Sequence, residues 1–225
     1  MLDYGDMTRV AVLFSGGRDS TLAALRTWRA GRLMDLLMFE SGLGVGSDLR
    51  DYRIRELERA WGGESFNARL IRTHGLVRRV CFVDLVEDIE RDRRQLILLG
   101  EFLSLLGSAI YYCRRHTIQT LVFGAVQYQD YLPEQQSQAL VRFAQFAERY
   151  GISLETPVSS AVSELSVKLE LAEAGLLPKS LEGYSVLADV DDSPPIDVVL
   201  AYIERKFPII ESYLDAQQIF PIGES

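Results

Sequence analysis

The sequence of 225 residues is poor in the side chains that build metal centres and nucleophilic pairs. It contains two cysteines, Cys81 and Cys113, and two histidines, His74 and His116. Both cysteines lie in apolar stretches, so we expect them to be buried thiols in or near the core. No spacing among these residues forms a cysteine-rich zinc site. The sequence therefore predicts no zinc site and disfavours a Cys–His nucleophile.

Long apolar runs and an excess of basic residues are also missing. No apolar run approaches the roughly 18 residues that a membrane span needs. The N-terminal stretch MLDYGDMTR carries acids rather than the basic region of a signal peptide. The net charge is -8, whereas proteins bind nucleic-acid phosphates mainly through Lys and Arg. We therefore expect a cytoplasmic protein with no membrane segment and no nucleic-acid partner.

Two widespread nucleotide-binding motifs are absent. A P-loop requires GxxxxGK[ST], and a dinucleotide-binding fold requires GxGxxG between its first strand and helix. Gly42, Gly44 and Gly46 are spaced two residues apart and do not complete the second pattern. A nucleotide site in this chain must therefore use a different loop.

The sequence does contain a regular alternation of short apolar runs and amphipathic segments. The apolar runs predict strands at residues 8–14, 34–39, 79–85, 120–126 and 152–155. Helical periodicity predicts helices at residues 18–29, 49–61, 96–115, 134–150, 163–174 and 196–213, the last broken at Pro208. Residues 65–79 fit either a helix or a loop with a strand, and residues 185–197 indicate a loop. This alternation predicts an α/β fold with a parallel sheet covered by helices on both faces.

The clearest candidate site is the stretch SGGRDS, residues 15–20, between the first predicted strand and the first predicted helix. A helix N-terminus presents unpaired N–H groups and the positive end of the helix dipole, which suit an anion. Two adjacent glycines, Gly16 and Gly17, allow an anion to approach the backbone without meeting a Cβ atom. These features together indicate a site for a polyphosphate.

The side chains of this loop support the same interpretation. Hydroxyl donors are available from Ser15, Ser20 and Thr21. Asp19 can cap the helix or help to hold Mg²⁺. An ordinary strand-to-helix turn capped by Asp19 is the alternative interpretation of the same residues.

SGGRDS after an apolar strand resembles the SGGxDS signature of the PP-loop ATP pyrophosphatases. That group includes asparagine, GMP and NAD synthetases, tRNA thiolation enzymes and 7-cyano-7-deazaguanine synthase. The resemblance covers residues 8–190 and implies a five-stranded parallel sheet of the adenine nucleotide alpha hydrolase-like type. It also implies cleavage of ATP between the α and β phosphates, with ATP and Mg²⁺ as cofactors. We expect one domain over residues 1–225, with residues 157–225 as a helical C-terminal extension.

Two later segments resemble 7-cyano-7-deazaguanine synthase in particular. FGAVQYQDYLPEQ, residues 123–135, resembles a stretch on the substrate side of that enzyme. ETPVSSAVSELSVKLELAEAGL, residues 155–176, resembles its proline followed by Lys-x-Glu near the start of a helix, so that Lys168 and Glu170 match the motif. The resemblance implies that Lys168 meets an ATP phosphate.

The resemblance assigns candidate roles by position. Asp19 and Lys168 are the predicted catalytic residues, and Asp19 is also the predicted Mg²⁺ ligand. The predicted ATP-binding residues are Ser15, Gly16, Gly17, Arg18, Ser20, Thr21, Met38, Phe39 and Gly124. The predicted substrate residues are Glu40, Gln127, Asp130, Tyr131 and Glu134.

Several of these residues also fit an ordinary structural role. Met38 and Phe39 fit the core, and Lys168 fits a solvated helix surface. Asp130 fits a turn, and Glu134 fits a helix start where the dipole stabilises an acid.

The sequence also departs from the synthase pattern. Where the synthases have a Tyr/Trp-Ser-Cys run and a cluster of zinc-binding cysteines, this chain has GYSV at residues 183–186, followed by VDDSPP. The Tyr-Pro-Asp-Cys-Arg run is replaced by YLPEQ at residues 131–135. The structural zinc of the synthases is therefore not expected, and the substrate pocket is altered.

Three functional hypotheses remain. The favoured one is an ATP-dependent adenylating enzyme that resembles the synthase of queuosine biosynthesis and acts on the carboxylate of a deazapurine-like small molecule or a protein acceptor. The second is tRNA thiolation, which the two scattered cysteines disfavour. The third is a non-catalytic nucleotide-binding partner subunit. The resemblance implies a homodimer.

Overall fold

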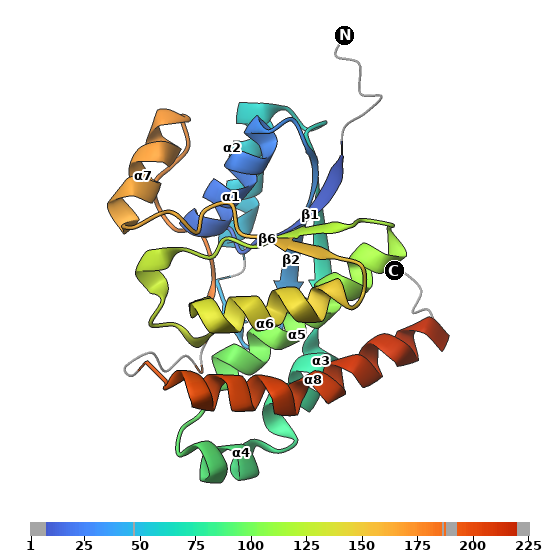
Figure 1. The fold of residues 1–225 in the computed structure, drawn as a ribbon. Helices are drawn as coiled ribbons and strands as arrows, with labels where there is room; N and C mark the ends of the chain where they lie inside the picture. The colour runs from blue at the N-terminus through green and yellow to red at the C-terminus, as the bar shows by residue number, and fades with distance from the viewer. Residues whose placement is uncertain (1–7, 47, 186, 188–192, 220–225) are drawn as a thin grey trace.

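The computed structural model describes residues 8–46, 48–185, 187 and 193–219 (Figure 1). Its centre is a parallel sheet of five strands in the order β4-β2-β1-β5-β6. These strands are β1 (Arg9–Leu13), β2 (Leu33–Glu40), β4 (Phe66–Arg72), β5 (Thr120–Val122) and β6 (Ser153–Glu155). The predicted α/β fold with a five-stranded parallel sheet is confirmed.

Helices cover both faces of this sheet. They are α1 (Arg18–Arg29), α2 (Leu49–Trp61), α3 (His74–Val77), α4 (Leu85–Asp92), α5 (Ile97–Arg115), α6 (Ser137–Glu148), α7 (Glu164–Glu173) and α8 (Ile196–Ile219). Short 3-10 turns lie at Gln127–Gln129 and Pro133–Gln135. A separate antiparallel pair joins β3 (Gly44–Val45) to β7 (Tyr184–Ser185).

The central strand β1 contributes to two hydrophobic cores, one on each face of the sheet. Val10 and Val12 pack in the core that contains residues of α1, α2 and α7. Ala11 and Leu13 pack in the core that contains residues of α5, α6 and α8. A strand buried on both faces has no polar alternation, which explains why this stretch is a continuous apolar run.

The strand predicted at residues 79–85 is wrong. Arg78–Phe82 form a turn of π-helix, and α4 begins at Leu85. The strand lies instead at β4, within the segment that fitted either a helix or a strand. β4 is an edge strand with mostly exposed side chains, so it lacks an apolar run. Val80 and Cys81 are apolar because they face α5, and a run this short does not distinguish a strand from a helix.

Two other boundaries differ from the prediction. α8 is not broken at Pro208 but continues through it to Ile219. Its apolar face packs against α5 and α6, with the Phe146 and Phe207 rings stacked at 4.1 Å, and this packing offsets the backbone hydrogen bond that proline cannot make. α6 begins at Ser137 rather than at residue 134. Most of the loop predicted at residues 185–197 lies outside the described residues.

The long helix α5 is the core of one layer. By length and composition, it is the one described helix apolar enough to cross a membrane, and 72% of it is buried inside the protein. Both thiols lie in the same core, at Cys81 and Cys113, as predicted. Burial raises the pKa of each thiol to about 12, so neither is a reactive thiolate near neutral pH.

A charged side chain is buried at the centre of β2. Asp35 is 0% exposed. Its carboxylate lies 2.8 Å from Arg9 Nη2, and it accepts hydrogen bonds from Tyr112 Oη at 3.0 Å and from Asn67 Nδ2 at 3.2 Å. These partners satisfy the carboxylate and connect β1, β2, β4 and α5.

Replacing Asp35 by Ala should lower the free energy of unfolding by about 3 kcal/mol, because Arg9, Tyr112 and Asn67 lose a common acceptor. Urea unfolding followed by circular dichroism measures this change. Asp51→Ala, on the exposed side of α2, is the matched control and should cost less than about 1 kcal/mol. Equal losses in the two variants would contradict a stabilising role for the Asp35 cluster.

Candidate functional site

The candidate site lies at the carboxyl edge of the sheet, where ligands bind in open parallel α/β folds. The ends of β1, β2 and β5 surround a cavity of about 520 Å³. Its lining includes Ser15, Asp19 and Ser20 from the SGGRDS loop, together with Phe39, Glu40, Gly124 and Glu134. The structure therefore brings part of the predicted ATP-binding set and part of the predicted substrate set to one cavity.

The SGGRDS loop turns from β1 into α1 at its two glycines. Gly16 has a φ of +83°, a value that favours glycine, and Gly17 is the N-cap of α1. Ser15 Oγ accepts a hydrogen bond from the Gly17 N–H at 3.2 Å and lies 3.1 Å from Ser20 Oγ. Thr21 is fully buried and its hydroxyl donates to the Gly17 carbonyl at 2.6 Å, so it shapes the loop rather than lining the cavity.

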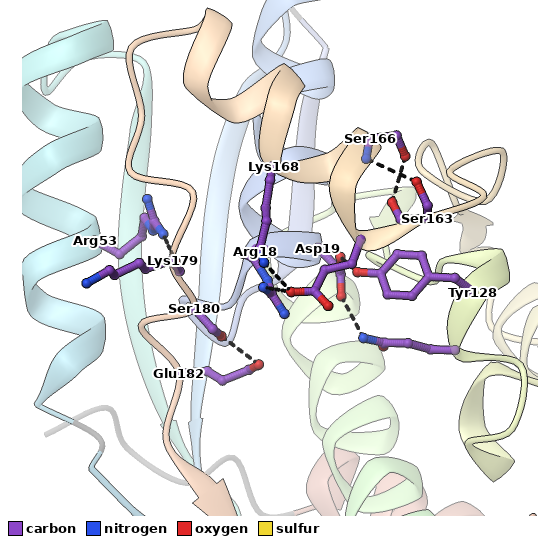
Figure 2. Close-up of polar contacts among 12 residues, drawn as sticks. Arg18, Asp19, Arg53, Tyr128, Ser163, Ser166, Lys168, Lys179, Ser180 and Glu182 are labelled. Carbon is purple, nitrogen blue, oxygen red and sulfur yellow. Dashed lines mark hydrogen bonds and ion pairs between the residues drawn. The ribbon is translucent and has the colours of Figure 1, made fainter.

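A carboxylate from a distant part of the chain lies against this loop. Ser15 Oγ donates a hydrogen bond to Glu182 Oε2 at 2.8 Å (Figure 2 shows Glu182 beneath Ser180). A Cβ atom built on Gly17 would lie only 2.4 Å from that oxygen. The glycine therefore makes room for an anionic oxygen. Sequence analysis missed Glu182, which is 167 residues from Ser15 and has no local motif.

Asp19 is held by two residues that follow β5. Tyr128 Oη donates to one carboxylate oxygen at 2.6 Å and Gln129 Nε2 donates to the other at 3.2 Å (Figure 2). The N-cap of α1 is Gly17, which has no side chain, so Asp19 does not occupy the capping position that the alternative interpretation gave it. Burial is the largest cause of a raised pKa for Asp19, and the Glu182 charge adds to it, whereas Tyr128 and Arg18 lower it.

Lys168 lies on the first turns of α7, beside the start of α1. Its Nζ atom is 2.6 Å from Glu164 Oε1, and Arg18 pairs with the same carboxylate (Figure 2). Lys168 and Arg18 lower the pKa of Glu164. The structure thus brings Lys168 close to the SGGRDS loop through Glu164. The Glu170 carboxylate, by contrast, pairs with Arg26 at 2.6 Å and joins α7 to α1.

Gly124 is the point where the end of β5 meets α1. A Cβ atom at Gly124 would lie 2.8 Å from the Ser20 nitrogen and 2.9 Å from the Asp19 carbonyl carbon. These are backbone atoms, which cannot move aside as the end of a flexible side chain can. Gly124 therefore sets the spacing between β5 and the candidate anion site.

The residues at the end of β2 divide between the cavity and the core. Phe39 and Glu40 line the cavity. Met38 is buried in the hydrophobic core and is not among the lining residues. Arg50 donates a hydrogen bond to the Phe39 carbonyl at 2.7 Å, which fixes the end of the strand.

Only part of the predicted substrate set lies at this cavity. Glu134 lines the cavity beside Glu101, Phe102 and Phe123. Its Oε2 atom is buried and makes no hydrogen bond within the described residues. Burial, with a contribution from Glu101, raises the pKa of Glu134 to about 7, against the effect of its own backbone N–H. The other three predicted substrate residues lie elsewhere: Gln127 and Asp130 line a separate depression, and Tyr131 is exposed and lines another.

No family model matches this sequence, and no curated protein matches it. Its fold is similar to that of a 4-thiouridine synthetase solved as an RNA complex with bound ATP, with a TM-score of 0.57 and 15% identity, over 92% of this chain and 53% of that chain. It is also similar to U34-tRNA thiolase NcsA from Methanococcus maripaludis, solved with its [4Fe-4S] cluster, with a TM-score of 0.51 and 13% identity, over 95% and 73% of the two chains. This chain therefore spans about half the length of the 4-thiouridine synthetase.

A third solved structure, described as a "predicted subunit of tRNA methyltransferase" from Methanocaldococcus jannaschii, has a TM-score of 0.49 and 18% identity, over 80% of this chain and 97% of that chain. The first two likenesses define the fold class. The chain shares the α/β fold of these two proteins.

Replacing Gly124 by Ala should lower the free energy of unfolding by about 1–3 kcal/mol, because the added methyl group overlaps the backbone of α1. Gly75→Ala is the matched control, since a Cβ atom at Gly75 meets no atom within 4 Å. Thermal unfolding of both variants measures the difference. Equal stability of the two variants would contradict the close approach of β5 to α1.

Proposed function

We propose that this chain binds ATP through the SGGRDS loop, cleaves it between the α and β phosphates, and transfers the adenylyl group to an acceptor in the adjoining cavity. One observation carries this proposal. The glycine-lined start of α1 has space for an anionic oxygen and already binds one, the Glu182 carboxylate, through Ser15. A helix N-terminus with this geometry suits a phosphate.

The proposed reaction is an in-line displacement at the α phosphorus. A carboxylate oxygen of the acceptor attacks, the bond between the α phosphorus and the bridging oxygen breaks, and pyrophosphate leaves. The backbone of Gly16 and Gly17, with the hydroxyls of Ser15 and Ser20, would hold the pyrophosphate. The protein acts mainly by positioning the reactants and by neutralising charge.

Lys168 would supply a mobile positive charge to the phosphates. Its side chain is 41% exposed, so it can exchange Glu164 for a phosphate oxygen without leaving a buried site. Asp19 would help to hold Mg²⁺, which neutralises phosphate charge when it is bound. A divalent cation beside Asp19 would relieve its repulsion with Glu182, although burial is the larger cause of the raised pKa of Asp19.

The far side of the cavity would hold the acceptor. Phe102 and Phe123 lie with ring centroids 4.8 Å apart and offer an apolar wall for a flat ring. Glu134 lines the same part of the cavity, and its unpartnered Oε2 atom, buried in this structure, would have to turn toward the cavity to accept from an N–H group of that ring. These features support a deazapurine-like carboxylate, free or attached to a protein, as the acceptor. The resemblance to 7-cyano-7-deazaguanine synthase supports the same class and a cytoplasmic homodimer.

tRNA thiolation is the second candidate, favoured by the likeness in fold to a 4-thiouridine synthetase and a U34-tRNA thiolase. The cysteine content disfavours it. An iron–sulfur cluster of the thiolase type is ligated by several thiolates, whereas this chain has two cysteines, both buried and both with a pKa raised to about 12. Adenylation without sulfur transfer therefore fits these residues better.

Purified protein should bind ATP with Mg²⁺ in a calorimetric titration and should release AMP and pyrophosphate when supplied with deazapurine carboxylates. Asp19→Asn should lower turnover about 100-fold, and Lys168→Ala should lower it by at least about tenfold, because each removes charge at the phosphates. Lys168→Arg keeps the charge and should restore part of the activity.

Two outcomes would contradict the enzymatic proposal. ATP binding that is unchanged in Asp19→Asn and Lys168→Ala, without AMP release, would indicate a non-catalytic nucleotide-binding subunit. Transfer of sulfur to a tRNA substrate would instead support the thiolation alternative.

Glu134 should make stability depend on pH. Its pKa is about 7 in the folded protein and about 4.5 without burial, so the folded state holds the proton more tightly. Its stabilising contribution is therefore complete below about pH 4.5 and is lost as the pH rises through about 7. Asp19, whose pKa is also raised, acts with the same sign.

Replacing Glu134 by Gln should therefore reduce the loss of melting temperature between about pH 5 and about pH 8. Differential scanning calorimetry at both pH values measures the effect. Glu173→Gln, on the exposed side of α7, is the control and should keep the pH dependence of the wild type. An undiminished loss in Glu134→Gln would rule out Glu134 as the group responsible.

A further inference from the structure

The segment at residues 177–185, which we call the strap, crosses the SGGRDS loop (Figure 2). It follows α7 and ends in β7. Glu182 lies near its centre and contacts Ser15. We propose that Glu182 is an internal competitor for the phosphate site, so that a nucleotide binds only when this carboxylate moves out. This inference rests on the proposed function, because it concerns access to the same loop.

The contacts of Glu182 are those that an anion would make at this loop. One carboxylate oxygen accepts a hydrogen bond from Ser15 Oγ at 2.8 Å, and the other accepts from Ser180 Oγ at 2.8 Å. The first oxygen is also the atom that a Cβ at Gly17 would approach to 2.4 Å. The space that glycine leaves open is therefore filled by Glu182, and a phosphate oxygen cannot share it.

The strap is fixed to the domain on the N-terminal side of Glu182. Arg53, which is 0% exposed, donates hydrogen bonds to the Leu177 carbonyl at 3.0 Å and to the Lys179 carbonyl. The Leu177 N–H donates to Glu56 Oε1 at 2.7 Å. These contacts hold the backbone of the strap beside α2.

The strap is also fixed next to Glu182 and on its C-terminal side. The Leu181 N–H donates to the Gly16 carbonyl at 3.2 Å, which joins the strap directly to the glycine loop. β7 pairs with β3, placing Ser185 opposite Gly44. Since the backbone is held on both sides, the position of residue Glu182 beside the loop is a property of the fold, while its side chain stays able to turn.

The charges also favour exchange of this carboxylate. The Glu182 charge contributes to the raised pKa of Asp19, so the two carboxylates repel each other at the loop. The Glu182 residue is solvent-exposed, and its carboxylate can turn into water without the cost of breaking a buried ion pair. The apparent affinity for phosphate is then the intrinsic affinity reduced by the fraction of molecules in which the loop is open.

Glu182→Gln and Glu182→Ala test this proposal, with inorganic pyrophosphate and ATP as the probes in calorimetric titrations. Removal of the charge should tighten pyrophosphate binding about tenfold in Glu182→Ala, which corresponds to a wild-type loop that is open about one-tenth of the time. Glu182→Gln keeps the size of the side chain and should show a smaller gain. Glu173→Ala is the control for a lost acidic residue near α7 and should bind as the wild type does.

The outcomes distinguish failure of the competitor role from failure of the proposed function. If the wild type binds ATP and Glu182→Ala binds pyrophosphate no more tightly, the competitor role fails while the phosphate site stands. If Glu182→Ala binds ATP more weakly than the wild type does, and only when Mg²⁺ is present, the competitor role is overturned. Glu182 would then be a ligand of the cation. If folded wild type and Glu182→Ala, checked by thermal unfolding, both fail to bind pyrophosphate and ATP, both proposals are overturned.

Discussion

The N-terminus of α1, at the end of the central strand β1, is the electrostatic feature on which the site depends. Its first N–H groups have no partner within the helix, and the N-cap residue Gly17 has no side chain with which to cap them. Asp is a residue type that often caps helices, but the Asp19 carboxylate instead accepts hydrogen bonds from Tyr128 and Gln129. The helix start is therefore left able to bind an anion, and the Glu182 carboxylate lies against it, hydrogen-bonded to Ser15.

The packing around α1 keeps this helix start in place. Gly124 allows the segment after β5 to pass close to the first turn of α1, and the Arg26–Glu170 ion pair holds α7 against the same helix. Two acidic residues of α7 make different ion pairs. Glu170 is the less exposed and fixes the helix, whereas Glu164 holds Lys168 near the loop in a surface pair that is weak enough to exchange.

Local patterns predicted the elements that build the loop, but not those whose character depends on distant neighbours. β1 and α1 were predicted because a strand buried on both faces and the SGGRDS motif are both local signals. The sequence does not distinguish a strand from a helix at β4, because an edge strand exposes most of its side chains. Residues 79–85 are wrongly predicted as a strand because their apolar side chains face α5. The site followed the same rule: Asp19 and Gly124 belong to short motifs, whereas the contact with Glu182 depends on the path of the chain after α7.

The strap is held beside the SGGRDS loop through its backbone. The guanidinium of Arg53 donates to two of its carbonyls, and β7 pairs with β3. Such hydrogen bonds fix the backbone while leaving the Glu182 side chain able to rotate. The order of the strap and the freedom of the Glu182 carboxylate therefore arise from different contacts of one segment, and the proposed competition at the phosphate site requires both.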